Sequence, residues 1–180
     1  ILSVRSQSGA FKSIFDIQDI PRVGRITFRK MTGMPYSKSR RHRRWKLAKL
    51  LELDIAQVGS LPGIAQTIAN RPGFSGCVIS DLDGLLLAEK GATEFAEALS
   101  AVTPRFLAQI TENAKIINLG PLDSVSLSVG EHMLTTVACG RICLTAIHLR
   151  GKLAKGQLTF IRKLASELGW LFSHRGYVGA

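Results

Sequence analysis

The segment 71–90 constrains the fold more than any other part of the chain, because it places two short apolar runs on either side of a turn. The first run, residues 76–80, is rich in Val and Ile, and the second, residues 85–88, is mostly Leu. Between them, Asp81-Leu82-Asp83-Gly84 supplies residues that tolerate left-handed backbone. The pattern predicts an antiparallel β-hairpin, and Pro72-Gly73 separates it from the segment before.

Amphipathic helices are predicted on both sides of this hairpin. Before it, Ser60 and Pro62 suit the N-cap and first turn of a helix that runs to residue 69, and residues 45–53 favour a shorter helix. After it, Thr93 is placed to cap a long helix over residues 93–113. Pro104 lies inside this helix and is expected to kink or divide it near residues 102 and 103.

Three further strands and a last helix complete the pattern. Residues 124–129, 132–138 and 142–149 are strand-like and are joined by short Gly-containing turns, which predicts an antiparallel meander. Apolar residues then recur at helical spacing over residues 152–172. The whole order predicts an α+β fold in which helices pack on the faces of a five-stranded antiparallel sheet.

The N-terminal third differs from the rest of the chain in charge. The net charge is +11, and residues 1–59 hold 13 Lys and Arg against 4 Asp and Glu. Residues 25–29 alternate like a single short strand, and residues 38–46 contain six cations. We therefore expect a basic, partly disordered extension over residues 1–55 in front of a domain over residues 56–180.

The basic run has two interpretations. The simpler one is a solvated tail without a specific ligand, since basic content alone is a weak signal. The other is a patch for nucleic acid or an acidic partner, in which cations contact phosphates and an aromatic ring stacks on a base. The candidate contact residues are Lys38, Arg40, Arg41, Arg43, Arg44, Trp45 and Lys46.

No arrangement of catalytic, metal-binding or cofactor-binding residues is visible. The three cysteines are an odd number and suit buried small side chains better than disulfides or a metal site. The two turn aspartates lack the further oxygen ligands of a Ca²⁺ loop. Ser124, His132 and His148 show no nucleophile-base-acid order. We expect a protein that is not an enzyme and uses no cofactor.

Composition fits this expectation. Hydrophobic residues make up 46% and charged residues 21% of the chain, which is typical of globular proteins. No apolar run approaches the roughly 18 to 20 residues of a membrane span, and nothing resembles a secretion signal. A cytoplasmic location is expected.

The element order and the hairpin sequence G-F-S-G-C-V-I-S-D-L-D-G-L-L-L-A over residues 73–88 resemble the roadblock family. This is the dynein-light-chain-type domain that is also found in bacterial and archaeal regulators of small Ras-like GTPases. The resemblance covers about residues 60–173 and implies a roadblock/profilin-like sandwich with strand order 2-1-5-4-3. It also implies homodimers or heterodimers formed through the long second helix and the edge of the third strand. The residues thereby assigned to either core or dimer interface are Phe95, Leu99, Val102, Phe106, Val125 and Leu127.

The resemblance implies a non-enzymatic dimeric scaffold. Its partner would be a second copy or a related subunit, and beyond that a small Ras-like GTPase or a signalling assembly. One alternative is a nucleic-acid-binding protein that uses the basic arm 38–46. Another is a ligand-sensing domain of similar topology, which would need a pocket with convergent polar groups.

Overall fold

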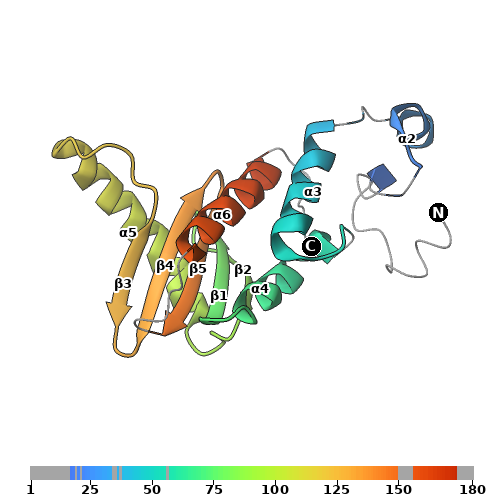
Figure 1. The fold of residues 1–180 in the computed structure, drawn as a ribbon. Coiled ribbons are helices and arrows are strands. Elements are labelled where there is room, and N and C mark those ends of the chain that lie inside the picture. Colours follow the sequence, from blue (N-terminus) through green and yellow to red (C-terminus); the bar gives the residue numbers. More distant parts are fainter. Residues whose placement is uncertain are drawn as a thin grey trace.

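A five-stranded antiparallel sheet forms the centre of the computed structural model, which describes residues 17–18, 20, 22–33, 36, 38–55, 57–149 and 156–173, without the side chains of 38–40. Its strand order is β2-β1-β5-β4-β3, which confirms the predicted fold class (Figure 1). The strands are β1 (Phe74–Asp81), β2 (Leu86–Lys90), β3 (Val125–Val129), β4 (His132–Cys139) and β5 (Ile142–Leu149).

The β1–β2 hairpin is closed by the predicted turn. The Asp81 carboxylate accepts hydrogen bonds from the backbone N–H groups of Asp83, at 3.0 Å, and Leu85, at 2.8 Å. Gly84 has a φ of +93°, a conformation that a side chain would disfavour. These aspartates therefore serve the turn, as the sequence suggested.

Helices cover both faces of the sheet (Figure 1). The helices α4 (Leu61–Ala69) and α6 (Gln157–Ser173) lie on one face, and α5 (Ala96–Ile116) lies on the other. The Ser60 hydroxyl caps α4 by accepting from the Gly63 N–H, as predicted. The main core fills the space between α4, α6 and the sheet, and its fully buried side chains include Ile64, Ile68, Ile79, Leu144, Ile161, Leu164 and Leu168.

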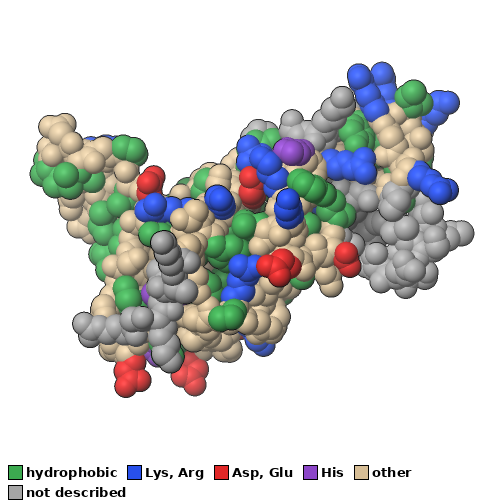
Figure 2. Space-filling model, in the orientation of Figure 1, with side chains coloured by type: hydrophobic (Ala, Val, Ile, Leu, Met, Phe, Trp, Pro, Cys, Tyr) green, Lys and Arg blue, Asp and Glu red, His purple; other side chains and the backbone are tan. Residues whose placement is uncertain are grey.

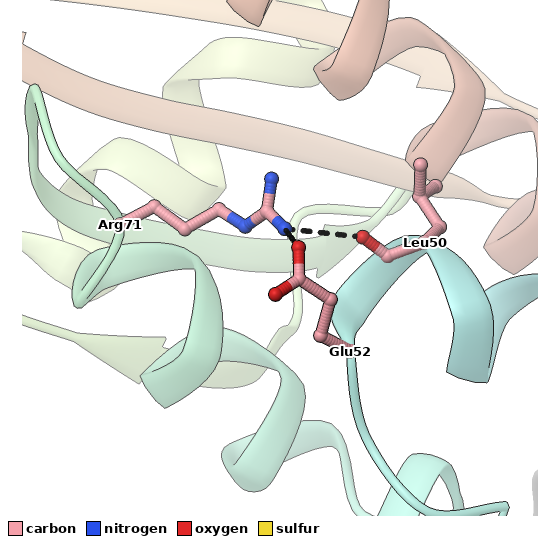
Figure 3. A network of polar contacts seen from close by, with 3 residues as sticks. All are labelled: Leu50, Glu52 and Arg71. Atoms are coloured by element: carbon pink, nitrogen blue, oxygen red, sulfur yellow. Dashed lines mark hydrogen bonds and ion pairs between the residues drawn. The ribbon is translucent and has the colours of Figure 1, made fainter.

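The basic run is helical and joins this core. Helix α3 (Lys38–Leu51) starts earlier than the predicted 45–53 helix and buries Leu47 and Leu51 in the main core. Arg71, which follows α4, contacts the C-terminal end of α3: it donates to the Leu50 carbonyl, at 3.3 Å, and to Glu52, at 3.0 Å (Figure 3). The proposed boundary near residue 56 thus falls between elements that share one core, and the division into extension and domain stays a prediction.

The strand predicted over residues 25–29 is wrong, because this segment belongs to a helix, α2 (Arg25–Thr32). Alternation needs a neighbouring strand to become a β-strand; here Phe28 instead packs with Ile20 and Val23 in a separate small cluster. Gly33 ends the helix in the left-handed conformation, and its N–H donates to the Arg29 carbonyl.

One prediction about α5 is wrong, and one of the two outcomes expected of Pro104 does not occur. Phe95, and not Thr93, occupies the N-cap position, and the Thr93 hydroxyl bonds to the Glu89 carboxylate at 3.1 Å. Pro104 does not divide the helix, which is continuous from Ala96 to Ile116. Beside the proline, the Thr103 hydroxyl donates to the Leu99 carbonyl at 2.6 Å. Across the described residues, no helix has the length and apolar character that a membrane crossing requires.

Candidate interaction surfaces

Helix α5 turns its smaller side chains toward the sheet. The residues it buries lie on one side of the helix and are mostly small or polar: Ala96, Ser100, Thr103, Pro104 and Leu107. The apolar stripe predicted from the sequence begins at Phe95. It is displaced from the buried residues by one position, or about 100° around the helix axis. Phe95 and Val102 are therefore turned away from the centre of the contact with the sheet, whereas Leu107 is buried in it.

The predicted interface residues of α5 divide into two groups. Phe95 is 42% exposed and Val102 is 62% exposed. Leu99 is half-buried and packs against the small cluster around Val78 on this side of the sheet, and Phe106 is also half-buried. Of these predicted residues, Phe95, at the N-cap of α5, and Val102 are exposed and available to a partner.

The edge strand β3 presents its apolar side chains on the same side of the sheet. Leu127 lies opposite Leu134 in the β3–β4 register, and Leu134 packs with the α5-side cluster. Side chains alternate along a strand, so Val125 and Val129 share this face with Leu127. Leu127 is 37% exposed, Val129 is 57% exposed and Val125 is half-buried. We call Phe95, Val102, Val125, Leu127 and Val129 the α5–β3 face.

The other side of β3 is polar and is bonded to the domain. The hydroxyls of Ser126 and Thr135 lie 3.0 Å apart, and Thr135 lies 3.0 Å from Nε2 of the buried His148. The Ser124 hydroxyl accepts from Arg162 of α6 at 2.9 Å. No pattern in the sequence predicted this network. It holds the edge strand in place, so the apolar face of β3 is presented by an ordered strand.

The basic run also divides into two groups. Arg41 donates to the Tyr36 hydroxyl, and Arg43 forms an ion pair with Glu167 of α6, both at 2.9 Å. Arg44 is buried and donates to the Ile55 carbonyl. Trp45 and Lys46 are exposed instead. The side chains of Lys38 and Arg40 lie outside the described part of the chain.

The remaining polar groups form no reactive centre within the described residues. Burial raises the pKa of Cys77 far above its usual range and the pKa of Cys143 to about 11. Both thiols are therefore protonated at neutral pH and unsuited to nucleophilic attack. No cluster of potential metal ligands occurs in the residues that the structure describes.

A pocket of about 420 Å³ lies beside Arg71 and is lined on other sides by Asn70, Phe74 and Gln157. The Arg71 guanidinium lies 4.1 Å from the centre of the Phe160 ring and is bonded to Glu52 and to Leu50 (Figure 3). These bonds join the end of α3 to the turn between α4 and β1. The charged group of this pocket thus has a structural role, and the pocket does not favour the ligand-sensing alternative.

No family model and no curated protein matches the chain. Among solved structures, Myxococcus xanthus MglB superposes with a TM-score of 0.55 at 19% identity, over 63% of this chain and 95% of that chain. A roadblock/LC7 domain from Streptomyces avermitilis gives 0.52 at 16% identity, over 64% and 97%. The gliding protein MglB from Thermus thermophilus gives 0.52 at 12% identity, over 78% and 96%. At such identities the likeness concerns the fold alone, and it confirms the predicted roadblock-type fold.

Proposed function

We propose that this roadblock-type domain is a non-enzymatic scaffold that dimerises through the α5–β3 face and, as a dimer, binds a small Ras-like GTPase or a signalling assembly. The observation that carries the proposal is the uncovered apolar surface. On α5, Val102 and the N-cap residue Phe95 remain exposed although the helix buries small residues, and Leu127 and Val129 of β3 are exposed as well. An arrangement of this kind is typical of a helix that packs on a second partner.

A second copy of the chain is the occupant that fits this surface best. The exposed side chains of the α5–β3 face are apolar. An apolar face can pack on the same face of a second copy, as a two-fold symmetric contact requires. An edge strand with uncovered apolar residues is also a site where association or aggregation is expected unless something covers it. The roadblock resemblance implies dimers through the same two elements.

The GTPase part of the proposal rests on the resemblance to the roadblock family. That family includes regulators of small Ras-like GTPases, and MglB structures share this fold. The raised pKa values of Cys77, Cys139 and Cys143, and the lack of a metal-ligand cluster among the described residues, support a role without chemistry of its own. The proposal places the protein in the cytoplasm, where such GTPases act.

Light scattering coupled to size exclusion tests the dimer. At concentrations of tens of micromolar the wild type is expected at twice the monomer mass, and Val102→Asp and Leu127→Asp are expected at the monomer mass, because a buried unpaired carboxylate is costly. Ile26→Asp is a matched control, since Ile26 is 72% exposed but lies on α2. A wild type that is monomeric throughout, or that is dissociated equally by the control, contradicts this assignment.

A calorimetric titration tests the partner. A purified small Ras-like GTPase from the same genome is titrated into the wild type in its GDP state and with a non-hydrolysable GTP analogue. Binding that depends on the nucleotide is expected for the wild type and is weakened in Val102→Asp if the dimer is required. An intact dimer that binds neither state removes the GTPase from the proposal and leaves the dimer.

A further inference from the structure

All of the excess positive charge of this protein lies in one segment. Residues 22–51 hold 11 Lys and Arg and no Asp or Glu, whereas the other residues hold 13 of each sign. Figure 2 shows Lys and Arg side chains gathered over the end of the molecule that α2 and α3 form. Beyond the dimer and its partner, we propose that this surface binds single-stranded nucleic acid.

The outer side of α3 carries the central part of the proposed surface. His42, Trp45, Lys46 and Lys49 are spaced by three, one and three residues, which places them on one side of a helix, and all four are at least partly exposed. The opposite side of α3 is fixed in the core by Leu47 and neighbouring leucines. In this orientation Lys46 and Lys49 face solvent, where they can contact phosphates.

The arginines beside this stripe hold the helix in position. Arg43 is paired with Glu167 and lies 5.4 Å from the centre of the Trp170 ring, both on α6. Arg41 is bonded to the hydroxyl of Tyr36. Because these bonds fix α3 on the domain, the exposed stripe is arranged before a ligand arrives, which lowers the entropic cost of binding.

Helix α2 adds cations next to the start of α3. The Tyr36 ring meets Phe28 of α2 edge-on at 5.9 Å while its hydroxyl is bonded to Arg41 of α3, so this residue joins the two helices. The exposed cations on α2 are Arg25, Arg29 and Lys30. The positive surface therefore extends over two helices, which suits a strand of several nucleotides.

Trp45 gives the surface a means of contacting bases. It is 52% exposed, the His42 ring stacks near it at 6.3 Å, and the Lys49 ammonium lies 5.5 Å from the centre of its indole. An exposed aromatic ring among cations is the arrangement that proteins use to stack unpaired bases while neutralising the adjacent phosphates. Bases in a duplex are not open to such stacking, so a single strand is favoured.

An anionic membrane is the competing partner, and the geometry argues against it. A helix that lies on a membrane inserts a continuous apolar face, but the leucines of α3 are used in the core. On α2, the exposed apolar residues Ile26 and Met31 are five positions apart and so lie on different sides of the helix. Trp45 alone would give little insertion.

Fluorescence anisotropy with the full chain tests the proposal. The probe is a fluorescein-labelled oligothymidylate of about 16 nucleotides, and an oligouridylate of equal length separates DNA from RNA. If about four phosphates are contacted, affinity falls about 50-fold between about 50 and 200 mM NaCl. Lys46→Gln/Lys49→Gln should lower the affinity and the salt slope, by about 0.7 for each phosphate that is no longer neutralised.

A matched control removes the same charge elsewhere. Lys90→Gln/Lys115→Gln neutralises two exposed lysines on β2 and α5 and is expected to bind like the wild type. Light scattering on each variant keeps the test separate from the dimer, since loss of nucleic-acid binding with an unchanged mass concerns this surface alone. Equal weakening by the two double variants would show non-specific attraction and overturn the proposal.

Trp45 is tested by substitution and by its fluorescence. Trp45→Ala is expected to weaken binding about 5-fold to 100-fold, with partial recovery in Trp45→Phe. The chain has two tryptophans, so a Trp170→Phe background leaves Trp45 as the single reporter, and stacking should quench it. Unchanged emission on binding, an unaffected Trp45→Ala variant, or binding to phosphatidylserine vesicles without binding to either oligonucleotide would each overturn the proposal.

Discussion

Helices α5 and α6 pack on opposite faces of the same sheet and differ in what they bury. Helix α6 places Phe160, Ile161, Leu164 and Leu168 in the main core, whereas α5 buries mostly small and polar side chains and leaves Val102 62% exposed. Both helices are amphipathic in sequence. The difference teaches that an apolar stripe identifies a surface that must be covered, without saying whether the sheet or another molecule covers it.

The largest effect that separates the two helices is expected from truncating their apolar residues. Leu164→Ala removes a fully buried side chain and should lower the free energy of unfolding by about 2 to 5 kcal/mol. Val102→Ala should change the unfolding of the dilute protein by no more than about 0.5 kcal/mol. Urea denaturation at submicromolar protein measures both. Similar losses for the two variants would mean that α5 and α6 are buried alike.

A smaller loss of stability is expected from substituting glycines at which α5 or α6 comes close to another part of the backbone. A Cβ at Gly169 of α6 would lie 2.3 Å from the Cys139 carbonyl oxygen, and one at Gly84 would lie 3.1 Å from Cα of Ala101 in α5. Gly169→Ala should therefore destabilise by about 1 to 3 kcal/mol, and Gly84→Ala by about 1 to 2 kcal/mol, because its left-handed backbone adds strain.

The control for these glycines is Gly63→Ala in α4. A Cβ there would make ordinary contact at 3.5 Å with Ser60, so this variant should be about 0.5 to 1 kcal/mol more stable than the wild type. Thermal denaturation of the three variants ranks them. A destabilised Gly63→Ala, or a neutral Gly169→Ala, would contradict the packing described for the α4 and α6 face.

The smallest effect concerns His148, a buried polar residue on the face of the sheet that α6 covers. Burial lowers the pKa of His148 below its ordinary value of 6.5. The unfolded chain then binds a proton more readily than the folded protein, so this contribution to stability is complete above the unfolded pKa and is lost as pH falls toward the folded pKa. The free energy of unfolding should decrease on acidification below about pH 6.5.

His148→Gln tests this assignment by removing the titrating group. Its unfolding free energy should fall less than that of the wild type between about pH 7 and pH 5, even if the variant starts from a lower value because the bond to Thr135 is altered. Parallel losses in the two proteins would assign the acid sensitivity to other groups.

Most of the fold could be predicted from local sequence. The hairpin turn, the Ser60 cap and the strand-like segments each carry chemistry that acts within a few residues, and the structure confirms them. The predictions were wrong where the structure of a segment depends on a contact with another segment. Residues 25–29 alternate but have no neighbouring strand and form part of α2, and the expected cap Thr93 instead bonds to Glu89.

The sequence by itself determined the order of the elements from α4 onward, the antiparallel sheet and the segment that holds the excess charge, because spacing and composition act locally. Tertiary structure decided which side of α5 meets the sheet. Two sets of α5 residues, one starting at Phe95 and the other at Ala96, have helical spacing, and only the second is buried against the sheet. Tertiary structure also decided that Arg43 binds the domain while Lys46 remains exposed. The physical reason is that burial and pairing depend on what lies opposite a side chain, and for Arg43 that is Glu167, 124 residues away along the chain.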